Sequence, residues 1–328
     1  MTTIQKVGTL ALLAATTVAA LAPVIAPNRG GDQFPDRAYA PPMRVHVRHN
    51  GSWHAPFVYG QVIDNRIMRT YHEDMSAAIP LSFFSGGHLV SVPDGGGPLL
   101  LFGADALGRD IFSRLVHGSQ LSLGVTILGA FGALILGAFV GALAGSAGGR
   151  TDAGLMLVTD FVLVLPGAYL VLVLRAMLPL VLATSEVFWL MVLLFAAAGW
   201  PHVARGVRAI VATERARDYA EAARAAGAGP LRLLGHLLPA ARHFLAVEIV
   251  LLIPALLVAE ATISYLGLGF PEPQASWGTM LQEASNVTVM TEAPWMLAPA
   301  VALFVVVLGV QLIAGARGQA SVLISSRS

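Results

Sequence analysis

Residues 121–147 read LSLGVTILGAFGALILGAFVGALAGSA, a run of 27 residues without a charged side chain. A helix rises 1.5 Å per residue, so about 20 apolar residues cross the hydrocarbon core of a bilayer. This run is long enough to cross at a tilt. Similar runs recur along the chain, and the sequence therefore predicts an all-α membrane protein with six transmembrane helices. The expected helices cover about residues 7–25, 121–147, 155–177, 187–209, 244–263 and 295–314.

The composition supports a membrane protein. Of 328 residues, 56% are hydrophobic and only 12% are charged, whereas roughly 25% of residues are charged in an ordinary soluble domain. A soluble domain of this length needs a larger wet exterior than these residues supply. The net charge of +1 gives no reason to expect nucleic acid as a partner. The absence of cysteine excludes disulfides, thiolate metal sites and cysteine nucleophiles.

The placement of arginine predicts the orientation of the helices. The loop 211–243 is rich in arginine, whereas the loop 264–294 has no lysine or arginine and carries three glutamates. Short basic loops stay in the cytoplasm. The sequence therefore predicts a multi-pass plasma-membrane protein with both termini in the cytoplasm and the loop 264–294 outside.

The expected domain organisation follows from these spans. Residues 1–26 form an N-terminal transmembrane helix, although Lys6, the apolar stretch and the small residues 18–22 also resemble a cleaved signal peptide. Residues 27–118 form an extracytoplasmic insertion. Residues 119–317 form a five-helix core that includes the cytoplasmic loop 211–243, and residues 318–328 form a cytoplasmic tail.

The insertion differs in composition from the rest of the chain. Residues 44–48 alternate between polar and apolar, Asn50-Gly51 is a tight-turn pair and 53–59 is aromatic, a pattern typical of a β-hairpin. Residues 89–98 give a weaker strand-and-turn signal. The sequence predicts a small β-containing insertion. The five histidines between residues 46 and 88 lack the close spacing of a strong metal-ligand motif, so solvated surface is the favoured interpretation and no metal site is assigned.

A stripe of small residues marks the run 121–147. It occupies every fourth position, at Gly129, Ala133, Gly137, Gly141 and Gly145. Small residues let two membrane helices approach closely, and van der Waals packing drives helix association in lipid. We therefore expect a helix-packing face here, with a partner helix in this chain or in another.

The basic loop 211–243 reads as two helices joined by a break. Residues 212–226 are strong helix formers, and Gly227, Gly229 and Pro230 would end that helix. A short helix over about 231–237 should follow and end before Pro239. A basic interfacial helix on anionic lipid is one interpretation. The acids Glu214 and Glu221 beside the glycine-broken turn fit a protein partner better.

Within this loop, Glu221-Ala222-Ala223, then Gly227, then Leu238-Pro239, resembles the "EAA" motif of permeases of ATP-binding-cassette importers. The spacing from Gly227 to Pro239 is one residue shorter than the family pattern. The resemblance implies that this hairpin seats in a groove of an ATPase. The coupling residues would be Asp218, Tyr219, Glu221, Ala222, Ala223, Gly227, Leu238 and Pro239.

The resemblance extends over about residues 105–317 and is specific for the dipeptide, oligopeptide and nickel permeases. Gly108, Arg109 and Asp110 lie in a segment similar to that family's signature before its second helix. Residues 264–269 and 276–278 resemble its outer loop, and the order matches the second, "C"-type, of its two permease subunits. The family implies a bacterial inner-membrane importer with a homologous second permease, two ATPase subunits, an extracytoplasmic substrate-binding protein and surrounding lipid.

The chain itself is not expected to be an enzyme. It has no Gly-x-x-x-x-Gly-Lys-Ser/Thr loop to hold ATP phosphates. ATP and Mg²⁺ would therefore bind in the partner ATPase, and no cofactor or catalytic residue is assigned to this chain.

Ionisable side chains inside membrane spans are costly, so they are functional candidates. Asp160, Glu248 and Glu260 are assigned to the translocation path or to an interface between subunits. Arg175 is expected to extend toward the outer surface.

Two other classes remain open at this level. An ion-driven secondary transporter or channel should show inverted repeats and broken helices, which we do not detect, and a membrane scaffold would transport nothing. Peptide is the favoured cargo by resemblance, with nickel or another small solute as the alternative.

Overall fold

The computed structural model describes residues 3–49, 52–65, 68–93, 95–165, 173, 182–227 and 235–325. Three features expected from the sequence lie outside these residues: the Asn50-Gly51 turn, Arg175 and the Gly229-Pro230 break.

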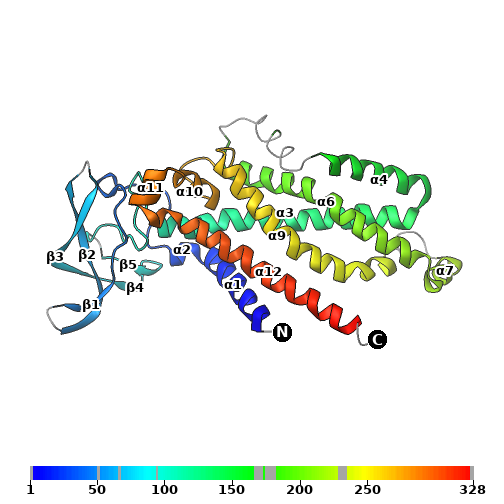
Figure 1. The fold of residues 1–328 in the computed structure, drawn as a ribbon, viewed down its shortest axis with the longest axis horizontal. Helices are drawn as coiled ribbons and strands as arrows, with labels where there is room; N and C mark the ends of the chain where they lie inside the picture. Colours follow the sequence, from blue (N-terminus) through cyan, green and yellow to red (C-terminus); the bar gives the residue numbers. More distant parts are fainter. Residues whose placement is uncertain are drawn as a thin grey trace. The chain divides into compact units, whose positions relative to one another are not determined.

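Long helices dominate the fold, and short strands occupy the stretch from 46 to 91 (Figure 1). The helical elements are α1 (Thr3–Ala20), α2 (Ala22–Ile25), η1 (Pro35–Arg37), α3 (Ile111–Ala147), α4 (Gly149–Val164), α6 (Thr184–Arg215), α7 (Asp218–Ala225), η2 (Leu238–Ala241), α9 (Arg242–Tyr265), α10 (Trp277–Glu283), α11 (Val287–Glu292), η3 (Pro294–Leu297) and α12 (Ala298–Ser325). The strands are β1 (His46–His49), β2 (Ser52–Asn65), β3 (Thr70–Pro80), β4 (Ser82–Ser85) and β5 (His88–Ser91).

Four helical segments among the described residues are long and apolar enough to cross a membrane: Ile111–Ala147, Thr184–Arg215, Gly235–Tyr265 and Pro294–Ala314. They contain the second, fourth, fifth and sixth of the expected runs. The first run, 7–25, covers most of α1 and all of α2. The third begins as α4 and continues into residues that are mostly outside the described ranges.

The helix α3 begins at Ile111, ten residues before the apolar run that predicted it. The carboxylate of Asp110 accepts hydrogen bonds from the backbone N–H groups of Phe112 and Ser113, both at 3.1 Å. An acidic side chain in this position satisfies donors that have no partner inside the helix. The helix therefore starts where its first turn is capped, not where its composition becomes uniformly apolar.

The chain forms two compact units. The first combines residues 1–10, 124–260 and 307–328, and the second combines residues 11–123 and 261–306.

In the first unit, α3, α6 and α9 run beside one another (Figure 1). Glycines of α3 face α6, so that a Cβ on Gly137 would lie 2.5 Å from the carbonyl oxygen of Trp200. Gly199 of α6 faces Leu252 of α9 in the same way, with 3.5 Å between the added Cβ and the leucine side chain. These small residues allow the close approach on which helix packing in membranes depends.

In the second unit, β1, β2 and β3 form an antiparallel sheet in that order, and β4 pairs with β5. The sequence patterns at 44–48 and 53–59 correspond to β1 and the start of β2. The sequence pattern does not indicate β3, because alanine and acidic residues, which are uncommon in strands, occupy part of it. The sheet packs on a small core of Ala40, Met43, Val58, Leu81, Leu99, Leu100 and Ala104.

Candidate functional site

The segment expected to couple to an ATPase is exposed at the end of α6. That helix runs to Arg215. Residues 216–217 are not helical, and α7 begins at Asp218. The expected single helix over 212–226 is therefore two helices. Glu214 connects the end of α6 to the start of α7: it accepts a hydrogen bond from the Tyr219 hydroxyl at 2.9 Å and forms an ion pair with Arg217 at 2.9 Å.

Among the α7 side chains whose burial the structure describes, one is buried and most of the others are exposed. Ala220 is fully buried, whereas Asp218, Tyr219, Glu221 and Ala222 are exposed and Ala223 is half-buried. Gly227 follows the helix with a φ of 79°, a left-handed conformation that glycine adopts without strain. This arrangement offers the motif residues to a partner while Ala220 fixes the helix on the protein.

The second half of the motif lies on η2. Leu238 is half-buried and Pro239 is exposed. The predicted short helix does not stop before Pro239, because this proline lies in the first turn of η2, where its missing N–H costs nothing, and α9 follows directly. The structure brings η2 against α6. The residues that would join α7 to η2 include 228–234, which lie outside the described ranges.

The predicted helix-packing residues meet a helix of the same chain. A Cβ on Gly137 or Gly145 would lie 2.5 and 2.8 Å from the carbonyl oxygens of Trp200 and Arg208, respectively, and one on Gly141 would overlap that of Ala204. The small-residue stripe of α3 thus forms a seam with α6.

Two arginine–aspartate pairs connect α4 to α6. Arg205 contacts Asp160 at 2.5 Å, and the two side chains are 53% and 49% exposed. Arg208 holds Asp152 through two hydrogen bonds, from Nε to Oδ1 and from Nη2 to Oδ2. The sequence identified Asp160 but not its partner, since the residues are 45 positions apart.

The other two predicted acids of the spans lie on α9. Glu260 is completely buried, and Glu248 is half-buried.

Arg109 of the signature segment belongs to a charge cluster in which both arginines and Asp105 are buried, whereas Glu272 is exposed. We call Asp105, Arg109, Arg114, Glu272 and Glu283 the outer-loop cluster. Asp105 accepts from Arg109 Nε and Arg114 Nη1, each at 2.6 Å, and both arginines also contact Glu283. Arg109 additionally contacts Glu272. Sequence reasoning found Arg109 but not this network, which joins two segments more than 160 positions apart.

Burial sets the protonation behaviour beside this cluster. Asp110 accepts hydrogen bonds from Asn28 and Ser113, yet burial dominates and raises its pKa to about 6. Burial also raises the pKa of Glu283, although the nearby Arg114 and Arg109 guanidinium groups act in the opposite direction. Gly108 has a φ of 75°, and a Cβ there would overlap the backbone of Phe34, so only glycine fits this turn.

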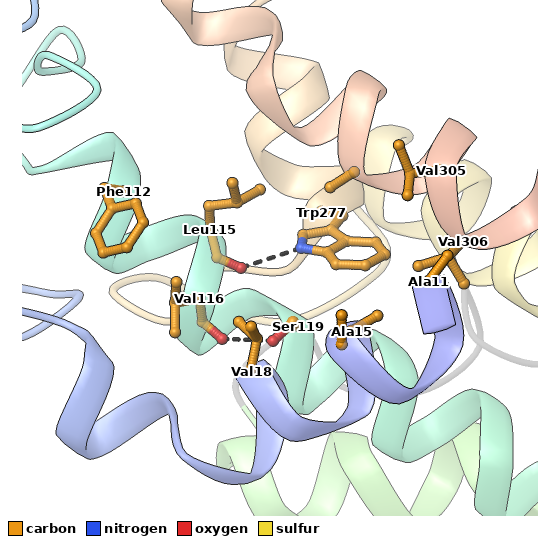
Figure 2. Close-up of a pocket in the computed structure, with 12 residues that line it drawn as sticks. Ala11, Ala15, Val18, Phe112, Leu115, Val116, Ser119, Trp277, Val305 and Val306 are labelled. Carbon is orange, nitrogen blue, oxygen red and sulfur yellow. Dashed lines mark hydrogen bonds between the residues drawn. The ribbon is translucent and has the colours of Figure 1, made fainter. Parts of the chain in front are cut away.

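An apolar cavity of about 300 Å³ lies next to Trp277 (Figure 2). Its two polar side chains are already satisfied: the Trp277 indole N–H donates to the Leu115 carbonyl at 3.1 Å, and the Ser119 hydroxyl donates to the Val116 carbonyl at 2.6 Å. Alanines of α1 such as Ala11 and Ala15 line the opposite side. The cavity therefore offers hydrocarbon surface only.

The described residues include no group of three or more histidine and carboxylate side chains arranged to hold a metal ion. Histidines of the insertion contact neighbouring side chains: His49 lies 2.7 Å from the Tyr59 hydroxyl, His72 2.6 Å from Asp64 and His46 3.4 Å from Glu73. His46 and His49 also pack against the ring of Phe57.

Comparisons with known proteins agree with this geometry. Residues 133–317 match the family described as the binding-protein-dependent transport system inner membrane component. The chain is 35% identical over 218 residues to a putative peptide permease protein of Brucella ovis, covering 65% of this chain and 69% of the relative. It is 36% identical over 223 residues to a putative peptide transport system permease protein of Brucella suis, covering 65% and 70%. It is 35% identical over 197 residues to the oligopeptide transport system permease protein OppC of Bacillus subtilis, covering 60% and 62%.

Proposed function

The chain belongs to the family of binding-protein-dependent transport system inner membrane components, and from this premise we propose that it carries di- or oligopeptides into the cell. It is a multi-pass permease subunit of an ATP-binding-cassette importer. We propose that it has six transmembrane spans in total, that both termini lie in the cytoplasm and that the β-containing insertion 27–118 lies outside. Peptide as the cargo is supported by the names of the relatives in Brucella and Bacillus, which are peptide permeases.

The observation that carries the coupling role is the exposure of α7. Four motif residues, Asp218, Tyr219, Glu221 and Ala222, face outward, while buried Ala220 anchors the helix. A helix that only stabilised its own chain would bury more of its surface. We infer that α7 and η2 form the docking element for an ATPase, in which ATP and Mg²⁺ bind, and that two such ATPases serve this subunit and a homologous second permease.

The linkage between α6 and α7 would transmit the movement. Glu214 at the end of α6 contacts both Arg217 and Tyr219 across the break. A displacement of α7 by a closing ATPase would therefore pull on α6 through these contacts as well as through the backbone. The bound peptide would arrive from an extracytoplasmic binding protein at the opposite side of the membrane.

The pair Asp160–Arg205 fits a wet or protein-covered face of the spans. Each side chain is about half exposed, and charged groups facing lipid cost several kcal/mol by some measures. We propose that Asp160 and Arg205 face the translocation path or the second permease. Glu248 belongs to the same proposal, whereas fully buried Glu260 acts within its own unit.

Charge reversal at Glu221 tests the coupling role. In Glu221→Lys, co-purification of the ATPase and ATP-driven peptide uptake should both fall to background. The lysine would present the opposite charge to the groove of the ATPase. The unfolding midpoint of the purified permease should not change. Glu186→Lys, the same reversal at the start of α6, is the matched control and should retain both activities. Normal ATPase binding by Glu221→Lys would refute the assignment of α7.

A further inference from the structure

A pocket of about 430 Å³ opens in the second unit, where the insertion meets the segment before the last span. Tyr39, Tyr71 and Trp295 give it aromatic walls, and Arg69 and Glu292 bring one charge of each sign. Its size lies within the range of about 300–1,000 Å³ that is usual for ligand pockets. None of its lining residues belongs to the coupling motif or to the outer-loop cluster.

The polar atoms of two aromatic side chains are already used elsewhere. The Tyr71 hydroxyl donates to the Ala38 carbonyl at 2.7 Å, and the Trp295 indole N–H donates to the Ala104 carbonyl at 3.0 Å. These bonds fix the rings and leave their faces as the surface of the pocket. Tyrosine and tryptophan held in this way are typical anchors of protein interfaces.

The third ring, that of Tyr39, already contacts a cation. The Arg69 guanidinium lies over the Tyr39 ring, 4.2 Å from its centroid, so one aromatic face is occupied by a cation of the same chain. Aromatic faces attract guanidinium and ammonium groups through their quadrupole. Glu292, the exposed last residue of α11, lines the same pocket and supplies a negative charge.

Arg69 also holds an unusual backbone conformation. Its φ is 51° at the end of the β2–β3 connection, and that of Tyr39 is 55°. Glycine or asparagine is the ordinary choice for a left-handed residue in such a turn. Two non-glycine residues in this conformation therefore meet at one cation–π contact, and strained residues of this kind are a reason to look for function.

We propose that this pocket is the docking site for a cationic side chain, arginine or lysine, on the extracytoplasmic binding protein. The inference rests on the proposed function, because it requires the insertion to lie outside and a binding protein to arrive there. The incoming cation contacts Glu292 and the aromatic rings, and Arg69 is an internal occupant that it competes with and displaces from Tyr39.

The displacement predicts opposite effects for two exposed residues. Nα-acetyl-arginine amide is titrated into the full chain in lipid nanodiscs and followed by saturation-transfer NMR, with the isosteric uncharged Nα-acetyl-citrulline amide as the control ligand. Glu292→Gln should weaken arginine amide binding roughly two- to fivefold, the range expected for the loss of one exposed ion pair. Arg69→Gly should tighten binding by a similar factor, and glycine relaxes the left-handed turn, so its unfolding midpoint should not fall.

Two results would overturn the proposal: equal binding of the arginine and citrulline amides, or reversed signs together with binding of Nα-acetyl-glutamate amide, which would make this an anion site. In cells, Glu292→Gln should lower peptide uptake without changing ATPase co-purification. Failure of the arginine amide alone removes only this docking site. Failure of the Glu221→Lys test removes the coupling assignment and leaves the ligand titration to be judged by itself.

Discussion

Arginine–aspartate pairs occur in both units of the protein, but their surroundings are opposite. In the outer-loop cluster, Asp105 and Arg114 are completely buried and each contacts more than one charged partner. On α4 and α6, Asp160 and Arg205 form one pair and remain about half exposed. Breaking a buried pair strands a charge away from water, whereas an exposed pair is worth about 0–1 kcal/mol. The first arrangement therefore supports the fold, and the second is free to serve a partner or a path.

The largest expected effect is at Arg114. Arg114→Met removes the contacts to Asp105 and Glu283 and leaves the Asp105 carboxylate buried with Arg109 alone. We expect the free energy of unfolding to fall by about 3–5 kcal/mol, measured by denaturant or thermal unfolding in detergent. Arg217→Met, which removes an exposed arginine from a single pair with Glu214, is the matched control. Equal losses in the two variants would erase the distinction between buried and exposed pairs.

The second effect is a pH dependence at the buried end of α3. The pKa of Asp110 rises from 3.8 to about 6 on folding, so the folded protein holds this proton more tightly than the unfolded chain. The stability that it contributes is complete below about pH 4 and is lost as the pH rises through 6. The loss is on the order of 3 kcal/mol. Unfolding followed from pH 4 to 7.5 should show it, and Asp110→Asn should flatten that profile; an unchanged profile would contradict the assignment.

The third effect tests the glycine contacts between α3 and α6, which we expect to stabilise the first unit more than its exposed ion pairs do. Gly141→Leu would force a side chain into the carbonyl of Ala204, and overpacking costs about 1–3 kcal/mol. Gly154→Ala in α4 is the control, because a Cβ there meets no atom within 4 Å. A stable Gly141→Leu protein would show that the seam between α3 and α6 is looser than its glycines indicate.

The smallest effect on stability is at the exposed pair itself. Arg205→Met should change the free energy of unfolding by less than about 1 kcal/mol. Peptide uptake should nevertheless fall, because this variant leaves Asp160 without its partner on the proposed path or subunit interface. A double-mutant cycle with Asp160→Asn separates the pair's own contribution from those of the single side chains. Normal uptake in all three variants would make the pair a surface feature only.

The sequence predicted what depends on local pattern. Apolar runs located the four candidate spans, and the four-residue glycine spacing identified the face of α3 that packs on α6. The helix break near Gly227 was visible for the same reason, since left-handed backbone selects glycine.

Long-range pairing could not be read in this way. Nothing near Arg114 indicates that its partners are Asp105, nine residues away, and Glu283, 169 residues away. Arg205 likewise gives no local sign of Asp160. The early start of α3 depends on one capping carboxylate, Asp110, which a hydropathy window averages away. The composition does contain one signal. The loop 264–294 has acidic residues and no basic residue, whereas the segment before and at the start of α3 has Arg109 and Arg114, and opposite charges of this kind favour contact between the two segments.

The glycine seam has a consequence for how the protein can move. Sliding α3 by one residue along α6 would shift it by about 1.5 Å and bring larger side chains against backbone that now faces Gly137, Gly141 and Gly145. The two helices can therefore rotate together as one rigid pair, but they cannot slide along each other. Because the chain has no native cysteine, spin labels at two introduced cysteines can measure the distance between α3 and α6 directly. The distance between labels on α3 and α6 should stay constant while the ATPase cycles.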